Sequence, residues 1–583
     1  MIDIAPFLDI ALFVTTCLAL ICGFPVAFTL AGTSLLFLGL HLLLGGDTLI
    51  GNLPARIFGS AMMNDTLLAI PLFLFMGAML EKSRIAEDLL TGLARLFGKR
   101  PGGLGLSVIL VGAMLAASTG IIGATVATMG MISLPAMLKR GYSPALASGT
   151  ICAAGTLGQI VPPSIVLVIL GDQISTAYQE AQSTLQQQAW ATGNTDFVPG
   201  AVSVGDLFAG ALLPGLILIV LYLIFIGVTA HVKPALAPPA SDISLDDDEN
   251  RPNLLKALAP PALLIAAVLG SILTGLAPPT EAAAVGAVGA TMLAAYRMPA
   301  DGHAIPETPV AGLLAALLGG LTLGGIGGAF VGDETATFGI HIAVGAGIGA
   351  VVVLVAVGSG GLAGLSSRSA RIERPTILTG IAAFPAMLLV PFLAPYLAIL
   401  LGLGVLAAFS RCWRAGLLQP VSRSVFETTA MIFSILIGAA VFGLVFRDLG
   451  GDDSIAEILN ALPGGTVGAM AAVMLTVFVL GFFLDFVEIC FVVVPIVAPI
   501  LLLDPTVSPV WLGVMLALNL QTSFLTPPFG FALFYLRGVA PTQVKTGDIY
   551  RGALPFVLLQ LAALAILATF PALSDWLPGK IFG

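Results

Sequence analysis

The chain has 583 residues, of which 58% are hydrophobic and only 9% are charged. Because soluble domains carry about 25% charged residues, this composition excludes a soluble globular protein and indicates a polytopic membrane protein. The formal net charge of −9 argues against nucleic acid as a partner, since proteins that bind it present a basic face. No Cys-x-x-Cys pair and no histidine cluster with ligand spacing is present, so no disulfide framework, zinc site or other cofactor is expected.

Apolar segments long enough to span a bilayer, which takes about 20 residues, recur along the chain. The first one lacks the positively charged start of a cleaved signal peptide, so we expect it to remain as a span. Two apolar segments, residues 104–138 and 466–503, are too long for one span and too poorly punctuated for two, and we interpret them as re-entrant hairpins. The other candidate spans are residues 6–22, 24–45, 66–80, 145–171, 207–230, 255–275, 280–296, 309–331, 339–357, 376–392, 395–410, 425–446, 509–536 and 550–572.

Lysine and arginine residues indicate the orientation, because they concentrate in cytoplasmic loops. Residues 82–100 contain five of them, so this loop is expected inside and the N-terminus outside. If hairpin 104–138 opens to the inside and hairpin 466–503 to the outside, the later basic clusters also fall inside. The stretch 172–200, which has no Lys or Arg, then falls outside.

Two similar stretches follow the two hairpins. "SPALASGTICAAGTLGQIVPPSIVLVIL" starts at Ser143 and "SPVWLGVMLALNLQTSFLTPPFGFALFYL" starts at Ser508, with the same spacing from Ser-Pro to a proline pair. Proline removes a helix hydrogen bond, and lipid offers no water to satisfy the groups that it frees. Two such breaks in register predict an all-α inverted repeat, with two re-entrant hairpins and two proline-broken helices. This arrangement is typical of secondary transporters, whose sites lie at the breaks.

The pattern divides the chain into segments of different expected roles. We expect the hairpins and broken helices to form a transport unit, and the other spans to brace it. The segments are N-terminal scaffold 1–103, first hairpin and broken helix 104–172, periplasmic loop 173–206, scaffold 207–299, inserted spans 300–410, second-half scaffold 411–465, second hairpin and broken helix 466–537, and C-terminal span 538–583.

Polar residues gather at the first hairpin tip and at both breaks. Hydroxyl oxygens and freed backbone carbonyls are ligands that suit sodium, although small residues also pack membrane helices closely and hydroxyls repair proline kinks. In the first half the candidates are Ser118, Thr119, Gly120, Thr125, Gly155, Thr156, Gly158, Pro162, Pro163 and Ser164. In the second half they are Asn519, Thr522, Ser523, Thr526, Pro527 and Pro528, with Gln159 and Gln521 nearby in the two breaks.

Two carboxylates, Asp485 and Glu488, lie in the second hairpin, three residues apart and on one face of a helix. Ionisable groups inside a membrane are expensive and indicate function by default. They could bind a cation, share a proton or cap a helix N-terminus. Glu281, after Thr280 at the start of a span, suits a structural role at the positive end of the helix dipole. No P-loop, nucleophile elbow or H-E-x-x-H motif occurs, so we do not expect an enzyme.

The first broken helix with its hairpin, together with "GLAPPTEAAAVGAVGA", "GFFLDFVEICFVVVPIVAPI" and "NLQTSFLTPPFGFALFYL", resembles the large membrane subunit of the tripartite ATP-independent periplasmic (TRAP) transporters. The resemblance covers most of residues 1–297 and 420–572. It implies a sodium-driven elevator of the ion transporter superfamily type, which works with a small four-helix membrane subunit and a periplasmic substrate-binding protein. It also implies sodium ligands at the hairpin tips and breaks, which here are Ser118, Thr119, Gly120, Gly155, Thr156, Pro162, Pro163, Asp485, Asn519, Thr526, Pro527 and Pro528.

Two features depart from the family pattern. Phe486 and Val487 follow Asp485 where the family often has Pro-Thr, and residues 300–410 are inserted. The sequence therefore predicts a multi-pass protein of a bacterial inner membrane that imports a small organic acid with sodium as coupling ion, surrounded by membrane lipid. The alternatives are a standalone sodium- or proton-coupled carboxylate symporter and, from another class, a non-transporting membrane scaffold or enzyme subunit.

Overall fold

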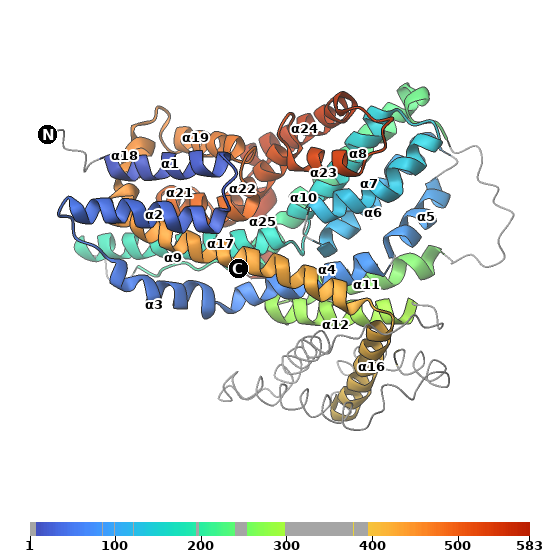
Figure 1. Cartoon of the computed structure of the whole chain (residues 1–583), viewed down its shortest axis with the longest axis horizontal. Helices are drawn as coiled ribbons and strands as arrows, with labels where there is room; N and C mark the ends of the chain where they lie inside the picture. The colour runs from blue at the N-terminus through green and yellow to red at the C-terminus, as the bar shows by residue number, and fades with distance from the viewer. Residues whose placement is uncertain are drawn as a thin grey trace. The chain divides into compact units, whose positions relative to one another are not determined.

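The computed structural model describes residues 7–83, 85–97, 100–119, 122–193, 197–239, 254–297, 377 and 394–582. All regular secondary structure in these ranges is helical. Five of these helices are long and apolar enough to cross a membrane, and the number rises to seven if each of two sharply bent helix pairs counts as one span. The prediction of an all-α membrane protein is confirmed (Figure 1).

The chain forms two compact units, and the larger one contains both predicted hairpins and both proline pairs. It comprises residues 1–68, 93–247 and 429–583. Its N-terminal helices are α1 (Leu8–Ile21), α2 (Val26–Leu43), η2 (Ile50–Asn52), α3 (Leu53–Ile57), the π-helical turn η3 (Phe58–Met62) and η4 (Asp65–Leu68). The central ones are α6 (Gly103–Thr119), α7 (Ile122–Lys139), α8 (Pro144–Thr156), η5 (Leu157–Gln159), α9 (Ile165–Ala191), α10 (Val204–Val232) and η6 (Pro234–Leu236).

The C-terminal part of this unit follows α17 (Leu418–Asp448), whose first residues belong to the other unit. Its helices are α18 (Gly451–Ala461), α19 (Gly465–Leu480), α20 (Phe486–Glu488), the π-helical turn η8 (Ile489–Val493), α21 (Val494–Leu501), α22 (Pro509–Leu525), α23 (Phe531–Val539), α24 (Thr546–Thr569) and α25 (Ala572–Ile581).

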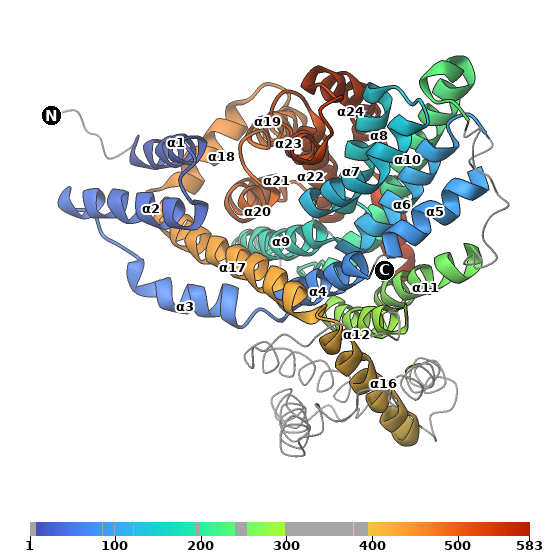
Figure 2. The same ribbon diagram turned by 45° about the vertical axis from the view of Figure 1, so that its right-hand side comes forward.

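Each long apolar segment contains helices that contact each other. In the first, α6 and α7 contact each other and both pack against α8, as Figures 1 and 2 show. In the second, α19 contacts η8 and α21 across the turn at residues 481–485. Both segments therefore contain more than one helix, as their length indicates.

The closest helix crossing in the larger unit joins α8 to α24. A Cβ added to Gly149 would lie 2.0 Å from the carbonyl oxygen of Gly552, and one added to Gly552 would lie 1.9 Å from that of Ala145. Only glycine fits at both positions, which lets the two backbones touch as small residues do at membrane helix contacts. This contact fixes the first half of the first broken helix.

The smaller unit comprises residues 69–92 and 248–428. Its helices are α4 (Ala69–Lys82), α5 (Ile85–Phe97), whose last residues belong to the larger unit, α11 (Leu254–Leu273), α12 (Pro279–Arg297) and α16 (Ala394–Arg414). Helix α12 packs against α4, α11 and α16, and most of its side chains are buried. Of the insertion predicted at residues 300–410, α16 is described, whereas the predicted spans 309–331, 339–357 and 376–392 lie outside the described residues, apart from residue 377.

Two expectations about the helices were wrong. Helix α9 does not end at residue 171 but continues to Ala191, because its polar half is rich in Ala and Gln, which are good helix formers. The following chain returns along it, where the Ser175 hydroxyl donates to the carbonyl oxygen of Val202 at 2.7 Å. The amphipathic helices α5 and α18 were also missed, since they are not apolar enough to be recognised as spans.

Candidate functional site

The first break lies between α8 and α9. Helix α8 starts with Ser143 at the N-cap and Pro144 in the first turn, a position that proline favours. It tightens into η5 and ends before the proline pair Pro162-Pro163, whose peptide bond is cis. Ser164 then caps α9, since its Oγ accepts from the Leu167 amide at 3.4 Å and donates to the Gln159 carbonyl at 2.9 Å.

The second break, between α22 and α23, follows the same plan. Ser508 caps α22, with its Oγ accepting from the Trp511 amide at 3.3 Å, and the helix ends at Leu525. The Thr526 hydroxyl donates to the Thr522 carbonyl at 2.7 Å, and the Pro527-Pro528 peptide bond is also cis. These side-chain hydrogen bonds satisfy backbone carbonyls near the break, as expected if the hydroxyls repair a proline kink.

The two breaks meet at equivalent positions of the two stretches. Thr156 and Gln521 are 365 residues apart, as are Ser143 and Ser508 and the two proline pairs. The Gln521 Nε2 group donates to the Thr156 hydroxyl oxygen at 3.4 Å, with both side chains fully buried. Helix α22 contacts both α8 and α9 around this point. The structure therefore brings the predicted break residues of both halves together.

Several polar atoms at this meeting point have no hydrogen-bond partner among the described residues. They are both amide atoms of Gln159, the Oε1 atoms of Gln521 and Gln560, and the Tyr222 hydroxyl, all in fully buried side chains. Gln560 Nε2 donates to the Thr156 hydroxyl at 3.5 Å, and the Tyr222 hydroxyl lies beside the same group. Leaving a buried polar group unpaired costs about 1–3 kcal/mol. Such groups in a native fold are explained by strain, by a functional role, or by a bound water or ion.

The hydroxyl groups at the breaks donate hydrogen bonds within their own helices, and their oxygens can still accept a cation. Thr156, Thr522 and Ser523 each donate to a carbonyl three or four residues earlier in their own helix, at 2.8 to 3.0 Å. Their oxygens keep lone pairs for a cation. Asn519 Nδ2 donates to the Met474 carbonyl at 2.7 Å and so ties α22 to the second hairpin.

The first hairpin tip is only partly described. Gly120 lies outside the described residues, and the same holds for the side chains of Ser118 and Thr119. Thr125 is buried on α7, one turn beyond the tip. Gly155 packs against Val126 of the same helix, where an added Cβ would approach Val126 Cγ2 to 2.3 Å. Hence the first turns of α7 lie next to the break.

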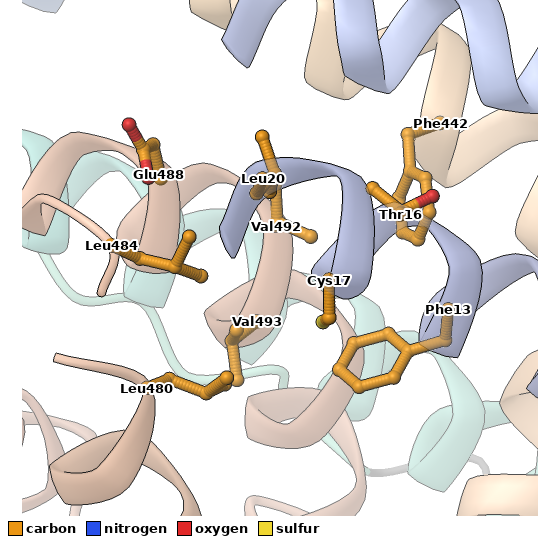
Figure 3. A pocket seen from close by; sticks show the side chains of 10 residues that line it. All are labelled: Phe13, Thr16, Cys17, Leu20, Phe442, Leu480, Leu484, Glu488, Val492 and Val493. Atoms are coloured by element: carbon orange, nitrogen blue, oxygen red, sulfur yellow. The ribbon is translucent and has the colours of Figure 1, made fainter. Parts of the chain in front are cut away.

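The second hairpin turn uses its two acids as a capping box. The Phe486 amide donates to Asp485 Oδ1 at 2.7 Å, and the Asp485 amide donates to Glu488 Oε2 at 3.2 Å, at the start of α20. Glu488 also lines a cavity of about 10 Å³ against Thr16 and Cys17 of α1 (Figure 3). That volume is about the minimum that holds one water. Of the three roles open to these acids, the geometry documents helix capping.

Two residues of the buried cluster escaped the sequence analysis. Tyr222 and Gln560 lie within the ordinary spans predicted at 207–230 and 550–572. The available signal was a lone polar side chain in each apolar run, which in a membrane needs a partner. Nothing in the sequence said which break they would face.

An all-helical membrane fold whose two interrupted helices meet at a buried polar cluster is the arrangement of secondary transporters. The chain belongs to the DctM component family of the tripartite ATP-independent periplasmic transporters, because the family model matches residues 13–193, 196–364 and 372–573. It is thus a transporter permease subunit and not an enzyme.

Two large permease proteins match nearly the whole chain. The C4-dicarboxylate TRAP transporter large permease protein of Vibrio cholerae is 25% identical over 575 residues, covering 98% of both chains. The protein of the same description from Pseudomonas aeruginosa is 25% identical over 540 residues, covering 92% of both. A crystal structure of the Alcanivorax borkumensis YdaH transporter aligns with 98% of this chain and 99% of its own, at 15% identity and a TM-score of 0.48.

Proposed function

We propose that this chain is the translocating subunit of a sodium-driven importer of a small organic acid in a bacterial inner membrane. Family membership supports transport, and the C4-dicarboxylate relatives make a small carboxylate the first substrate class to test. The site of coupling is the buried meeting point of the two breaks. One observation carries this assignment: Gln521 and Gln560 both donate from Nε2 to the Thr156 hydroxyl oxygen, while their buried Oε1 atoms have no partner among the described residues.

Sodium fits this donor set, since amide, hydroxyl and carbonyl oxygens bind it without a buried negative charge. Sodium ligands proposed from the family are Ser118, Thr119, Gly155, Asp485, Asn519 and Thr526, to which the buried cluster adds Gln159 and Gln521. The ion would order both hairpin tips against the breaks. Substrate carboxylate would then meet hydroxyls and helix N-termini. Because each ligand completes the site of the other, movement of a half-filled transport unit is disfavoured.

The partners in the proposal are the small four-helix membrane subunit and a periplasmic substrate-binding protein. Both follow from the tripartite family and not from any contact in this chain. The proposed topology places the N-terminus and the polar half of α9 outside. Substrate would therefore arrive at the outer ends of α9 and α17.

Thermal unfolding of the purified chain tests the proposal without a known substrate. At 100 times its dissociation constant, a ligand of the folded state stabilises by about 2.7 kcal/mol. We expect sodium chloride, but not choline chloride at equal ionic strength, to raise the unfolding temperature in a saturable way. Equal curves in the two salts, with folded protein, would contradict sodium coupling.

Uptake into proteoliposomes separates the proposal from its alternatives. With the small subunit and binding protein present, an inward sodium gradient should drive accumulation of radiolabelled succinate or a related acid. Uptake that needs no binding protein would favour the standalone symporter. No uptake of any acid in the presence of both partners would favour the scaffold.

A further inference from the structure

A cavity of about 500 Å³ opens in the larger unit, lined by charged and apolar side chains, none of them a candidate residue of the two breaks. Residues of α3, α9, α17 and the second hairpin line it. In the view of Figure 2, α9 lies between α20 and α17. The volume falls in the range of about 300–1,000 Å³ that is typical of small-molecule sites.

Both π-helical turns of the larger unit contribute to this cavity. Gly59 and Ser60 belong to η3, and Phe491 and Val492 belong to η8. A π turn is rare and is found frequently at functional sites. Two π-helical turns in the lining of one cavity therefore suggest a binding site, and this argument does not depend on the charged groups of the cavity.

The charged groups of the cavity are unequally paired. Arg447 donates from Nη1 and Nη2 to both carboxylate oxygens of Glu180, at 2.9 and 3.0 Å, and its Nε lies 3.1 Å from Asp452 Oδ2. The remaining acid, Asp172, accepts from Asn64 Nδ2 at 2.8 Å and from Gln173 Nε2 at 2.9 Å. These three acids therefore all have donors.

Arg56 is the exception. Its half-buried guanidinium lines the same cavity and is attracted at longer range by Glu180 and Asp452, but the described residues offer it no ion pair within 4.0 Å and no hydrogen bond. A guanidinium presents five N–H donors in a planar fork that matches a carboxylate bidentately. In a cavity of this size, a ligand carboxylate can replace the water that solvates Arg56.

We propose that this cavity is an outer docking site for a small organic acid, whose carboxylate is held by Arg56. The inference rests on the proposed function, because the topology given there places the polar half of α9 and the end of α17 on the outer side. It deepens that function by placing a substrate contact ahead of the buried breaks.

The acids of the cavity also set how tightly it can bind. Arg447 is shared by two carboxylates, and Asp172 adds a third, so the two arginines face three acids. An incoming anion is attracted by Arg56 and repelled by Glu180 and Asp452. We therefore expect a weak site, with a dissociation constant on the order of 1 mM, as suits transient docking.

The test is a binding measurement on the purified full chain in phosphatidylcholine nanodiscs. The probes are straight-chain mono- and dicarboxylates of two to six carbons, titrated by calorimetry in sodium chloride. The variants are Arg56→Gln, Glu180→Gln and Ser60→Phe, which places a large side chain in the cavity. The control is Arg423→Gln, which removes an exposed arginine outside the cavity.

We expect at least one acid to bind the wild-type protein. Arg56→Gln should weaken it at least tenfold, as loss of a charge-assisted pair implies. Ser60→Phe should also weaken it, Arg423→Gln should leave it unchanged, and Glu180→Gln should tighten it severalfold, because a competing carboxylate is gone.

Three results would overturn the inference: no wild-type binding of any probe, equal binding by Arg56→Gln and wild type, or weaker binding by Glu180→Gln. If no acid binds but a titrated short-chain phosphatidylglycerol does, and Arg56→Gln abolishes that binding, the site belongs to lipid and the inference is equally overturned. The sodium response in thermal unfolding is measured on the same samples. It tests the proposed function separately, because none of these variants lies at the breaks.

Discussion

The contact between α8 and α24 gives the sharpest prediction about the fold. An alanine at Gly552 would place its Cβ 1.9 Å from the Ala145 carbonyl oxygen, whereas ordinary contact starts at 3.4 Å, so the helices must separate by about 1.5 Å. The obstacle is backbone, which cannot rotate away. Overpacking of this kind costs about 1–3 kcal/mol, and here we expect the upper end. Because alanine has a higher helix propensity than glycine, by up to about 1 kcal/mol, Gly552→Ala should lower the free energy of unfolding by about 2 kcal/mol in total.

Gly547 supplies the matched control for this prediction. It lies in the first turn of the same helix, and an added Cβ there meets nothing within 4 Å. Gly547→Ala should therefore be neutral or stabilising by up to about 1 kcal/mol. The assay is reversible unfolding in mixed micelles with increasing sodium dodecyl sulfate, followed by circular dichroism. Equal stability of the two variants would refute the close approach of the two backbones.

Three other predictions follow from single contacts. Ser164→Ala should cost about 1 kcal/mol of unfolding free energy by removing the α9 cap, whereas Ser143→Ala, at a cap with no side-chain bond, should cost less in the same micelle assay. Asn519→Leu should cost about 0.5–2 kcal/mol by freeing the second hairpin from α22, and equal stability to wild type would contradict the bond to Met474. Hydrogen bonds from Thr466 and Thr506 lower the pKa of Asp504, in the loop between α21 and α22, below its ordinary value. The ionised Asp504 carboxylate therefore stabilises the fold at pH values above its unfolded-state pKa of about 3.9, and this contribution is lost as the pH falls through its folded-state pKa. In Asp504→Asn, the unfolding free energy should therefore depend less on pH below about 4. An unchanged slope of unfolding free energy against pH would refute this prediction.

The sequence predicted the parts of the fold that membrane physics determines directly. Apolar length located most of the described apolar helices within a few residues, and the proline pairs located both helix breaks, because proline removes a helix hydrogen bond. The excess length of residues 104–138 and 466–503 predicted more than one helix in each, whereas their re-entrant form stays a prediction. The predicted end of α9 was wrong, because apolar length gives no information on a helix whose second half is polar and forms through helix propensity.

The site was predicted less completely than the fold. Sequence placed Thr156 and Thr526 at breaks, but it could not show that Gln560 and Tyr222 from ordinary spans face Thr156. The spacing of Asp485 and Glu488 left cation binding, proton sharing and capping open, and the geometry supplies only the cap. The sequence analysis did not identify Arg56 as a candidate binding residue. A single arginine indicates a binding site only when the structure shows that the acids around it are paired with other donors.

Equilibrium binding of radioactive sodium to the purified chain tests the central claim most directly. The claim is that the buried breaks form the coupling-ion site, so Gln159→Leu and Gln521→Leu should each weaken sodium binding roughly tenfold or more. Gln188→Leu, at an exposed position near the end of α9, should bind sodium as the wild type does. Wild-type affinity in both break variants, with the proteins folded, would contradict the account and move the ion elsewhere.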